Sequence, residues 1–264
     1  MENNVYIAFY KPDGVLTAFT DPEGRETLKS YIDVPDVYPV GRLDLNSEGL
    51  LLLTNDGELA HRLTDPRYNH PKTYLVQVEG IPSSEQLAEL ESGVEVKGVK
   101  TRRAQVLQVP EPDLPPRRKP ITPHGPTAWL RMVLREGKKR QIRHMTAAVG
   151  LPTLRLIRIA VGPVSLIGLQ PGEWRYLTPA EIDALQQITA RSRRLAANRP
   201  AAPEASKPVR PRRPVHARRS PTGPAKDRPS TQDRTPGAGK KPAKSPGSAR
   251  GSRGRTGGRR SPSR

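Results

Sequence analysis

The sequence predicts an α+β fold, in which many short strands are interspersed with a few amphipathic helices. Short apolar runs with the length and alternation of strands recur through the first three quarters of the chain. Helix-capping patterns, in which Ser, Thr or Asn precedes Glu or Gln by three residues, mark the starts of other segments. These elements do not follow a repeated strand–helix–strand order, which argues against a doubly wound dinucleotide-binding domain.

Composition divides the chain into a globular domain, residues 1–196, and a basic tail, residues 197–264. The tail holds 19 Lys and Arg against three acidic residues, with 12 Pro, 8 Gly and no Leu, Ile, Met, Phe, Trp or Tyr. Such a segment cannot bury enough apolar surface to offset its chain entropy, so we expect a disordered C-terminal tail. It carries +16 of the formal net charge of +19, which leaves the globular domain nearly neutral.

Two apolar runs near the N-terminus predict buried strands. Residues 5–9 (VYIAF) form the first run, which ends at the turn-forming residues 11–14. The second run is Leu50–Leu53. A further apolar segment ends at Val40, so the polar residues 41–49 lie between this segment and the second run. We therefore expect residues 41–49 to form a loop that connects two strands.

A short helix and a strand are predicted next. Asn55 with Glu58 three residues later is typical of a cap that opens a helix, which runs through Leu63 and ends at the Asp-Pro pair 65–66. Residues 73–78 (TYLVQV) alternate between apolar and polar side chains, as expected for a half-buried strand.

The middle of the chain predicts a second helix and two strands. Ser83 and Gln86 have the spacing of a capping box, and Gly93 is expected to end the helix that follows. Residues 104–109 and 128–134 have the composition of strands.

A long loop and a basic helix are expected around these strands. Residues 110–126 are rich in Pro, which forbids regular ladder pairing, and long loops in compact domains are often functional. Residues 138–149 predict a basic amphipathic helix, because apolar side chains recur at helical spacing among cationic ones. The apolar set is Ile142, Met145 and Val149.

The last two predicted elements are a strand at residues 154–161 and a helix that begins near Thr178. Thr178, Pro179 and Glu181 combine an N-cap, a proline at the first helical position and a capping box.

Several classes of protein are excluded by composition. The chain has no Cys, so it has neither a disulfide framework nor Cys-ligated zinc, and the spacing of its five His predicts no metal site. The N-terminus does not resemble a signal peptide, and no apolar stretch approaches the roughly 20 residues of a membrane span. We therefore expect a cytoplasmic protein that does not bind a membrane.

The loop at residues 41–49 holds the most unusual acidic residue, Asp44. With Asn46 and Glu48 it imitates the start of a calcium-binding loop, but the twelfth position of such a loop is here Asn55 and not Glu. We therefore reject calcium and expect Asp44 to be either structural or reactive.

Basic residues gather in one part of the globular domain. Residues 97–143 hold 13 Lys and Arg against three acids, so that the rest of the globular domain is net negative. A basic segment on a nearly neutral domain indicates contact with a polyanion, and the Arg- and Gly-rich tail is similarly typical of an RNA-binding arm.

Three segments in order resemble the RsuA-type family of pseudouridine synthases. They are GRLDLNSEGLLLLTNDG (41–57), KTYLVQVEG (72–80) and EGKKRQIRHM (136–145). The resemblance implies the pseudouridine synthase fold, a mixed and mostly antiparallel sheet with flanking helices and a central catalytic cleft. The first strand begins at residue 5, so we expect no S4-type RNA-binding domain before it. Together with further segments, among them TLKSYI (27–32) and GEWR (172–175), this resembles the family members that lack an S4-type domain and act on 23S rRNA.

The resemblance implies an isomerase that converts a uridine of 23S rRNA to pseudouridine without a cofactor, a metal or an obligate protein partner, as a monomer. Asp44 would be the essential carboxylate, and would either attack C1′ of the ribose or remove the C2′ proton. Arg143 would pair with Asp44 and keep it ionised. Tyr74 would stack on the uracil and take the C5 proton, although a strand aromatic at this position has an ordinary structural role too.

The remaining site residues would bind the RNA. Ile142 would line the uracil pocket, and Arg42 would enter the RNA stack or hold a phosphate where the base leaves. Lys138, Lys139 and Arg140 would contact phosphates, the alternative being a solvated helix face. A second hypothesis for the whole chain is a noncatalytic RNA-binding or ribosome-assembly factor, which the presence of Asp44, Tyr74 and Arg143 disfavours.

Overall fold

The computed structural model describes residues 4–197, and the side chains of residues 4–190. The strands are β1 (Tyr6–Lys11), β2 (Tyr38–Pro39), β3 (Glu48–Thr54), β4 (Lys72–Glu79), β5 (Glu95–Val96), β6 (Val99–Lys100), β7 (Gln105–Val109), β8 (Thr127–Leu134), β9 (Thr153–Val161), β10 (Val164–Ser165) and β11 (Trp174–Tyr176). The helices are α1 (Gly57–Thr64), α2 (Ser84–Ser92), α3 (Gln141–Ala148) and α4 (Pro179–Ala197), with 3-10 turns η1 (Leu28–Ser30) and η2 (Pro66–Tyr68).

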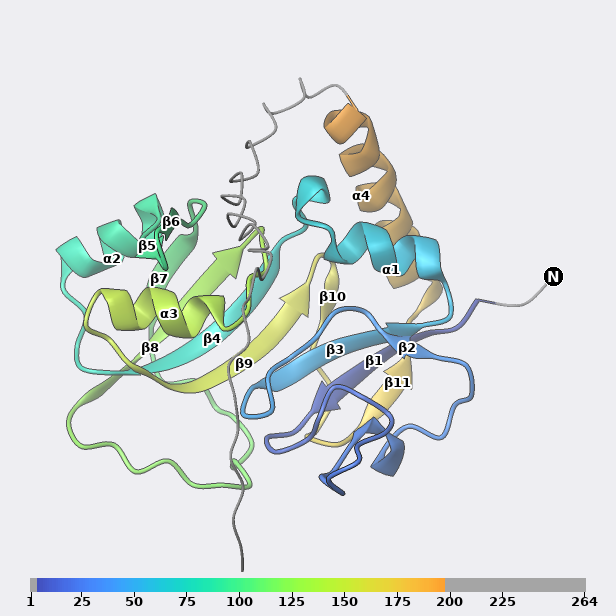
Figure 1. Cartoon of the computed structure of the whole chain (residues 1–264), viewed down its shortest axis with the longest axis horizontal. Helices are drawn as coiled ribbons and strands as arrows, with labels where there is room; N and C mark the ends of the chain where they lie inside the picture. Colours follow the sequence, from blue (N-terminus) through green and yellow to red (C-terminus); the bar gives the residue numbers. More distant parts are fainter. Residues whose placement is uncertain (1–3, 198–264) are drawn as a thin grey trace, which may run out of the picture. The chain divides into compact units, whose positions relative to one another are not determined.

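One mixed sheet organises the described residues (Figure 1). Its main path runs β11-β1-β3-β9-β4-β8-β7, while β2 pairs with β3 and β10 with β9. Within residues 4–197, β3 and β9 are the parallel pair in this sheet, and the other neighbours are antiparallel. The α+β class and the mixed, mostly antiparallel sheet are therefore confirmed. The predicted tail, apart from Ala197, lies outside the described residues.

Strands β1 and β3 are buried on both faces, which explains their continuous apolar sequences. Successive side chains of a strand point to opposite faces, so each strand contributes to two cores. One core contains Ile7, Phe9, Leu51 and Leu53. The other contains Tyr6, Ala8, Tyr10, Leu50 and Leu52.

The predicted caps of α2 and α4 are confirmed. Ser83 and Gln86 form both hydrogen bonds of a capping box, and Gly93 follows the last residue of α2. Thr178 and Glu181 exchange the corresponding bonds at the start of α4, Glu181 accepting from Thr178 N at 2.9 Å and donating from its own N to Thr178 Oγ1 at 3.2 Å.

The predicted starts of two other helices were wrong. Helix α1 is capped by Asp56, whose carboxylate accepts from Leu59 N, because Asn55 Oδ1 instead accepts from Val5 N at the start of β1. Helix α3 begins at Gln141, and Arg140 before it has a positive φ of 53°. Lys138, Lys139 and Arg140 are therefore in a loop and not on a helix face.

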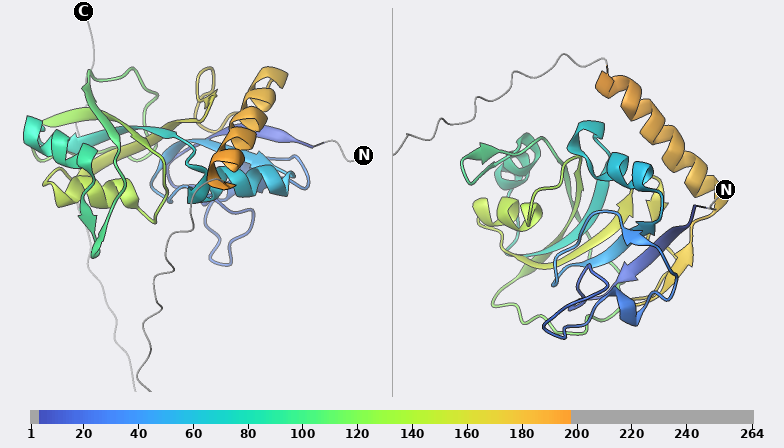
Figure 2. Two further views of the ribbon diagram at one scale, coloured as in Figure 1. Left: turned by 90° about the horizontal axis from the view of Figure 1, so that it is seen from above. Right: turned by 45° about the vertical axis from the view of Figure 1, so that its right-hand side comes forward.

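The helices flank the centre of the sheet in two groups. Helices α2 and α3 share a core with β4, β7 and β8, whereas α1 and α4 share a core with β1 and β3. Figure 1 shows β9 and β4 running between α3 and α1. The right-hand view of Figure 2 shows the same order of these elements. The polar loop before β3 reaches this part of the sheet, where it lines a cavity together with residues of β4 and β9.

Candidate active site

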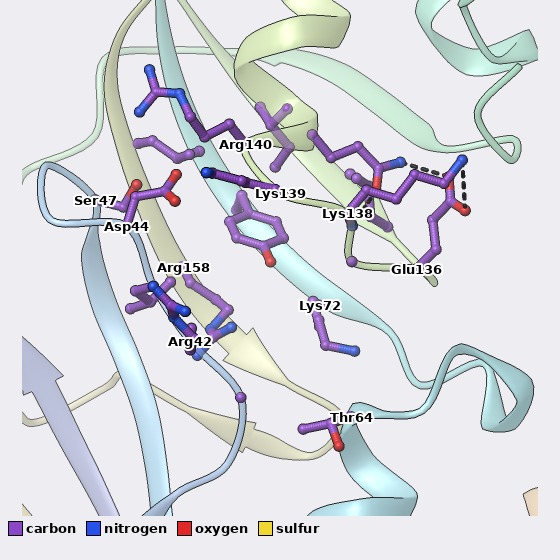
Figure 3. Close-up of a pocket in the computed structure, with 18 of the residues that line it drawn as sticks. Arg42, Asp44, Ser47, Thr64, Lys72, Glu136, Lys138, Lys139, Arg140 and Arg158 are labelled. Atoms are coloured by element: carbon purple, nitrogen blue, oxygen red, sulfur yellow. Dashed lines mark hydrogen bonds and ion pairs between the residues drawn. The ribbon is translucent and has the colours of Figure 1, made fainter. Parts of the chain in front are cut away.

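A cavity of about 470 Å³ opens over β4 and β9, and its volume suits a nucleoside or a similar small molecule (Figure 3). Its wall comes from the β2–β3 loop, the end of α1, β4, the loop before α3, and β9. Seven of the eight site residues predicted from the sequence line it, namely Arg42, Asp44, Tyr74, Lys138, Lys139, Arg140 and Ile142. The eighth, Arg143, does not.

The loop that carries Asp44 is held from both sides by β1 and the segment after it. Thr17 Oγ1 donates to Leu43 O at 2.8 Å and accepts from Leu43 N at 3.2 Å, while Leu45 O accepts from Gly14 N at 2.9 Å. Asp44 stands between these two anchors, half-buried, and Figure 3 shows its carboxylate at the cavity wall beside Ser47. A flanking backbone tied in this way fixes the position of the acid.

Glycine is required where this loop enters β3. Gly49 has a φ of +104°, and its α-carbon pairs with that of Arg158 on the parallel neighbour β9. A Cβ at this position would be 2.3 Å from the carbonyl oxygen of Arg158. The close approach of β3 to β9, which brings the Asp44 loop to the cavity, therefore depends on the absence of a side chain.

Strand register brings three polar side chains to the same face. Tyr74 of β4 pairs with Arg158 of β9, and cross-strand partners point to the same side of a sheet. Lys72, two residues before Tyr74, is on this face as well because strands repeat every two residues. All three side chains line the cavity.

A buried carboxylate shapes the loop before α3. Glu136 is 7% exposed and accepts from Gln141 Nε2 at 2.6 Å and from Arg102 N at 2.9 Å. The other end of the Gln141 amide accepts from Lys138 N at 2.9 Å. This network explains the late start of α3 and turns Lys138, Lys139 and Arg140 toward the mouth of the cavity, where all three are exposed.

The ion pair predicted between Asp44 and Arg143 is not present among the described residues. The guanidinium of Arg143 donates to Asn46 O at 3.0 Å and to Thr153 O at 3.2 Å, so it joins α3 to the backbone of the Asp44 loop. Its Nε is buried without a hydrogen-bond partner. Burial lowers the pKa of Arg143 and nearby Arg140 lowers it further, while Asp44 opposes both.

A buried ionic network lies behind the same loop. Glu48 accepts from Arg155 Nε at 3.0 Å and Nη2 at 2.8 Å, and from Arg117 Nε at 3.0 Å. Arg117 also pairs with Asp13 and donates to Asn46 O at 3.3 Å. Arg117 thus joins the long loop 110–126 to the start of β3, to the loop that carries Asp44 and to the turn after β1.

This network shows that part of the basic segment 97–143, which is expected to contact a polyanion, is paired with acids of the protein itself. Arg117 has only 12% of its side chain exposed. Arg118 pairs with Glu26 at 2.5 Å and donates to the Tyr31 hydroxyl at 2.6 Å. Acids from the N-terminal half therefore neutralise the Arg pair of the long loop, whereas Lys138, Lys139 and Arg140 remain exposed.

No cluster of His, Asp and Glu that could hold a metal ion occurs in residues 4–190. Of the helices in the part of the chain that the structure describes, none is long and apolar enough to cross a membrane. The cavity is lined by two carboxylates, Asp44 and the buried Glu136, by the phenol of Tyr74, by an apolar wall and by six Lys and Arg. That combination suits an anionic ligand that carries a flat ring.

Comparisons with known proteins agree with this description. The family described as RNA pseudouridylate synthase matches residues 5–148. The chain belongs to this family. Its members are isomerases that convert uridine in RNA to pseudouridine, so the chain is an RNA pseudouridine synthase, and the family resemblance inferred from the three motifs is confirmed.

Two relatives illustrate the similarity. The chain is 49% identical over 174 residues to ribosomal large subunit pseudouridine synthase E of Vibrio vulnificus. This match covers 65% of this chain and 74% of the relative. It is 53% identical over 170 residues to the protein of the same name from Xanthomonas campestris pv. campestris. This match covers 62% of this chain and 91% of the relative. A solved pseudouridylate synthase structure superposes with a TM-score of 0.60 at 29% identity, and covers 70% of this chain and 75% of its own.

Sequence analysis missed several polar residues of the cavity wall, among them Ser47, Lys72, Glu136 and Arg158. Lys72 could have been predicted, because it immediately precedes the predicted strand 73–78 and lies two residues before Tyr74, on the same face. Arg158 could not, since its place depends on which strand lies beside β4. Glu136 was masked by the basic residues that follow it in the sequence.

Proposed function

We propose that the protein isomerises a uridine of large-subunit (23S) rRNA, with Asp44 as the catalytic carboxylate. The observation that carries the proposal is the position of Asp44 at the wall of a nucleoside-sized cavity, with Tyr74 and Ile142 on that same wall. The family membership supplies the reaction, and the names of the relatives supply the class of RNA.

The reaction exchanges one glycosidic bond for another. The C1′–N1 bond of the uridine breaks, the uracil turns, a C1′–C5 bond forms, C5 loses its proton and N1 gains one. Atoms balance within the nucleotide. Asp44 takes part either by attacking C1′ or by removing the C2′ proton, and both routes need its ionised form.

Tyr74 and Ile142 would hold the detached base. Ile142 is 4% exposed and belongs to the core shared by α3 and β4, so it offers a rigid apolar wall. Tyr74 lies on the adjoining strand and contacts the same core, which leaves its ring available for stacking on uracil and its hydroxyl for the C5 proton.

Arg143 would complete the site when the nucleotide is bound. Its Nε is buried and lacks a partner, and its Nη2 already contacts the loop of Asp44 through Asn46 O. We propose that a small rotation of Asp44 brings its carboxylate to this Nε. The pair would then offset the desolvation of both groups as the base closes the cavity.

The exposed cations at the mouth of the cavity would offset the free energy needed to extrude the uridine from the RNA. Extruding a base from folded RNA costs a few kcal/mol, which contacts to the backbone must offset. Lys138, Lys139 and Arg140 are exposed beside the cavity and suit phosphate contacts, while Arg42 faces them from the β2–β3 loop and suits the space left by the base.

We further propose the setting in which this chemistry occurs. The protein would act as a cytoplasmic monomer on rRNA, with residues 1–196 as the catalytic domain and residues 197–264 as a basic arm that adds affinity. The charge of +16 on the arm supports the last point.

The test is to map pseudouridines in 23S rRNA from cells with the gene, without it, and with the Asp44→Asn variant. We expect one position to lose its modification in the deleted strain and to regain it with the wild-type protein but not with Asp44→Asn. RNA binding by Asp44→Asn should be largely retained, because the substitution preserves size and removes a negative charge. A normal modification level with Asp44→Asn would exclude Asp44 as the catalytic group, and an unchanged map after deletion would favour the noncatalytic assembly factor.

A further inference from the structure

Two cations of the cavity, the buried Arg158 and the half-buried Lys72, have no acid within ion-pair distance among the described residues. Arg158 and Lys72 line the part of the cavity between Asp44 and Thr64, as Figure 3 shows. Neither is used in the reaction described above. Their surroundings indicate a second ligand group next to the uracil.

Arg158 is 4% exposed, and within the part of the chain that the structure describes its side chain makes one hydrogen bond, from Nε to Leu50 O at 2.7 Å. No carboxylate of the described residues lies within ion-pair distance of it. Arg155, three residues earlier on β9, is also buried, but its Nε and Nη2 both donate to the carboxylate of Glu48. The terminal nitrogens of Arg158 therefore face the cavity without the partner that a buried guanidinium ordinarily has.

Lys72 also has no acidic partner among the described residues. Its ammonium donates only to two carbonyl oxygens, Leu63 O at 3.4 Å and His70 O at 3.5 Å, both near the upper limit of a hydrogen bond. Burial lowers the pKa of Lys72 to about 8, and the charge of Arg158 contributes to this lowering. Two cations that repel each other in a partly dry cavity are stabilised when an anion binds between them.

We propose that Lys72 and Arg158 form a binding site for one phosphodiester group of the RNA backbone, next to the uridine held at Asp44 and Tyr74. This inference rests on the proposed function. Uracil carbonyls are neutral and cannot balance two cations, whereas a phosphodiester carries one charge on two free oxygens that can face an ammonium and a guanidinium together. The pairing of Tyr74 with Arg158 places the phosphate site directly beside the base site.

The first experiment uses small probes, so it does not depend on catalysis. Binding of uridine, uridine 5′-monophosphate and uridine 3′-monophosphate to the full-length protein is measured by calorimetry. We expect one of the monophosphates to bind about tenfold more tightly than uridine, because one charge-assisted contact contributes at least that factor. The preference should disappear in Lys72→Met and persist in Lys29→Met, which removes an exposed cation far from the cavity.

Two further variants guard against a folding defect. Arg158→Lys keeps a charge on β9 and should retain part of the preference, while Arg158→Met should lose it. If Arg158→Met does not fold, Lys72→Met and Arg158→Lys decide the matter. Equal affinity for uridine and both monophosphates in the wild type, or an undiminished preference in Lys72→Met, would overturn the inference.

The second experiment places the phosphate in RNA. Once the target uridine is mapped, short RNAs with a single uncharged methylphosphonate on its 5′ or 3′ side are compared as substrates. We expect one of the two to raise KM in the wild type and to have no further effect in Lys72→Met. Independent effects of the methylphosphonate and of Lys72→Met would contradict a direct contact. If no uridine is modified at all, the proposed function fails, while the nucleotide titrations still decide the phosphate site.

Discussion

At the scale of single residues, the site is defined by how few of its cations have acidic partners. Asp44 faces a cavity lined by six Lys and Arg, and the other carboxylate on the wall, Glu136, is occupied by Gln141, Arg102 and Lys138. The excess of positive charge in the cavity suits a polyanionic substrate. The predicted partner of Asp44, Arg143, acts on the backbone of its loop.

Two substitutions of Arg143 distinguish the effect of its charge from the effect of its two hydrogen bonds to the backbone. Arg143→Lys keeps the charge but cannot span Asn46 O and Thr153 O as the planar guanidinium does, so we expect about a 100-fold loss of kcat with nearly unchanged RNA affinity. Arg143→Ala should lose the rate and also about 1–3 kcal/mol of stability. Single-turnover assays and thermal unfolding check both. A Lys variant with the wild-type rate and pH profile would exclude this role.

His70 should make the protein sensitive to mild acid. It is 3% exposed, its Nε2 has no partner, and burial lowers its pKa from 6.5 to about 4, with Lys72 and Arg135 contributing. Because the unfolded state binds this proton first, the free energy of unfolding should fall as pH decreases from about 6.5 to about 4. The loss from this group is on the order of 2 kcal/mol. Denaturant titrations of His70→Phe, which cannot be protonated, should show a shallower decline over that window, and parallel curves would contradict the assignment.

At the scale of elements, local signals predicted what local interactions determine. The caps of α2 and α4 were predicted because each involves residues three positions apart. The starts of α1 and α3 were not, because Asn55 bonds to β1 and the loop before α3 is held by Glu136, whose carboxylate also binds Arg102. The two- and three-residue strands β5, β6, β10 and β11 were also missed, since pairing with other segments and not propensity creates them.

The contact between β3 and β9 gives an element-scale prediction. Gly49→Ala places a Cβ against the backbone of Arg158, so we expect a loss of about 2–4 kcal/mol of stability and a displaced Asp44 loop with reduced kcat. Gly57→Ala is the matched control, because a Cβ there meets nothing within 4 Å. Its stability should be unchanged or slightly higher. Equal unfolding midpoints for the two variants would show that β3 can move away from β9 without cost.

The long loop 110–126 gives a second element-scale prediction. Arg117→Met leaves Asp13 buried without its partner and removes a donor to Asn46 O, so we expect about 3–5 kcal/mol lower stability and a reduced rate. Arg118→Met, the next residue, breaks an exposed pair and should cost less than about 1 kcal/mol. Thermal unfolding and initial rates compare them. If Arg118→Met were the more harmful, the loop would act through its surface and not through the buried network.

At the scale of the whole molecule, the candidate site was predictable because its residues belong to three recognisable segments that the sheet brings together. Asp44, Tyr74 and Ile142 meet at one cavity although they are spread over about 100 residues of sequence. The partners of Arg117 were not predictable, because Asp13 in the turn after β1 and Glu48 at the start of β3 are distant in sequence and meet only in the folded sheet. The proposed phosphate site at Lys72 and Arg158 was not predicted for the same reason, because it depends on β9 lying beside β4 in the sheet.

The uneven charge of the chain leads to the last prediction. Residues 197–264 carry +16, and the cavity itself depends on residues before them, so the two should contribute to different parameters. A variant that ends at Ala197 should bind rRNA more weakly and with a smaller dependence of log Kd on log salt, because fewer counterions are released. Its rate at saturating RNA should be unchanged. A full-length control in which the tail sequence is shuffled keeps the charge and should keep both affinity and slope. Equal slopes for truncated and full-length protein would mean that the tail does not contact the RNA backbone.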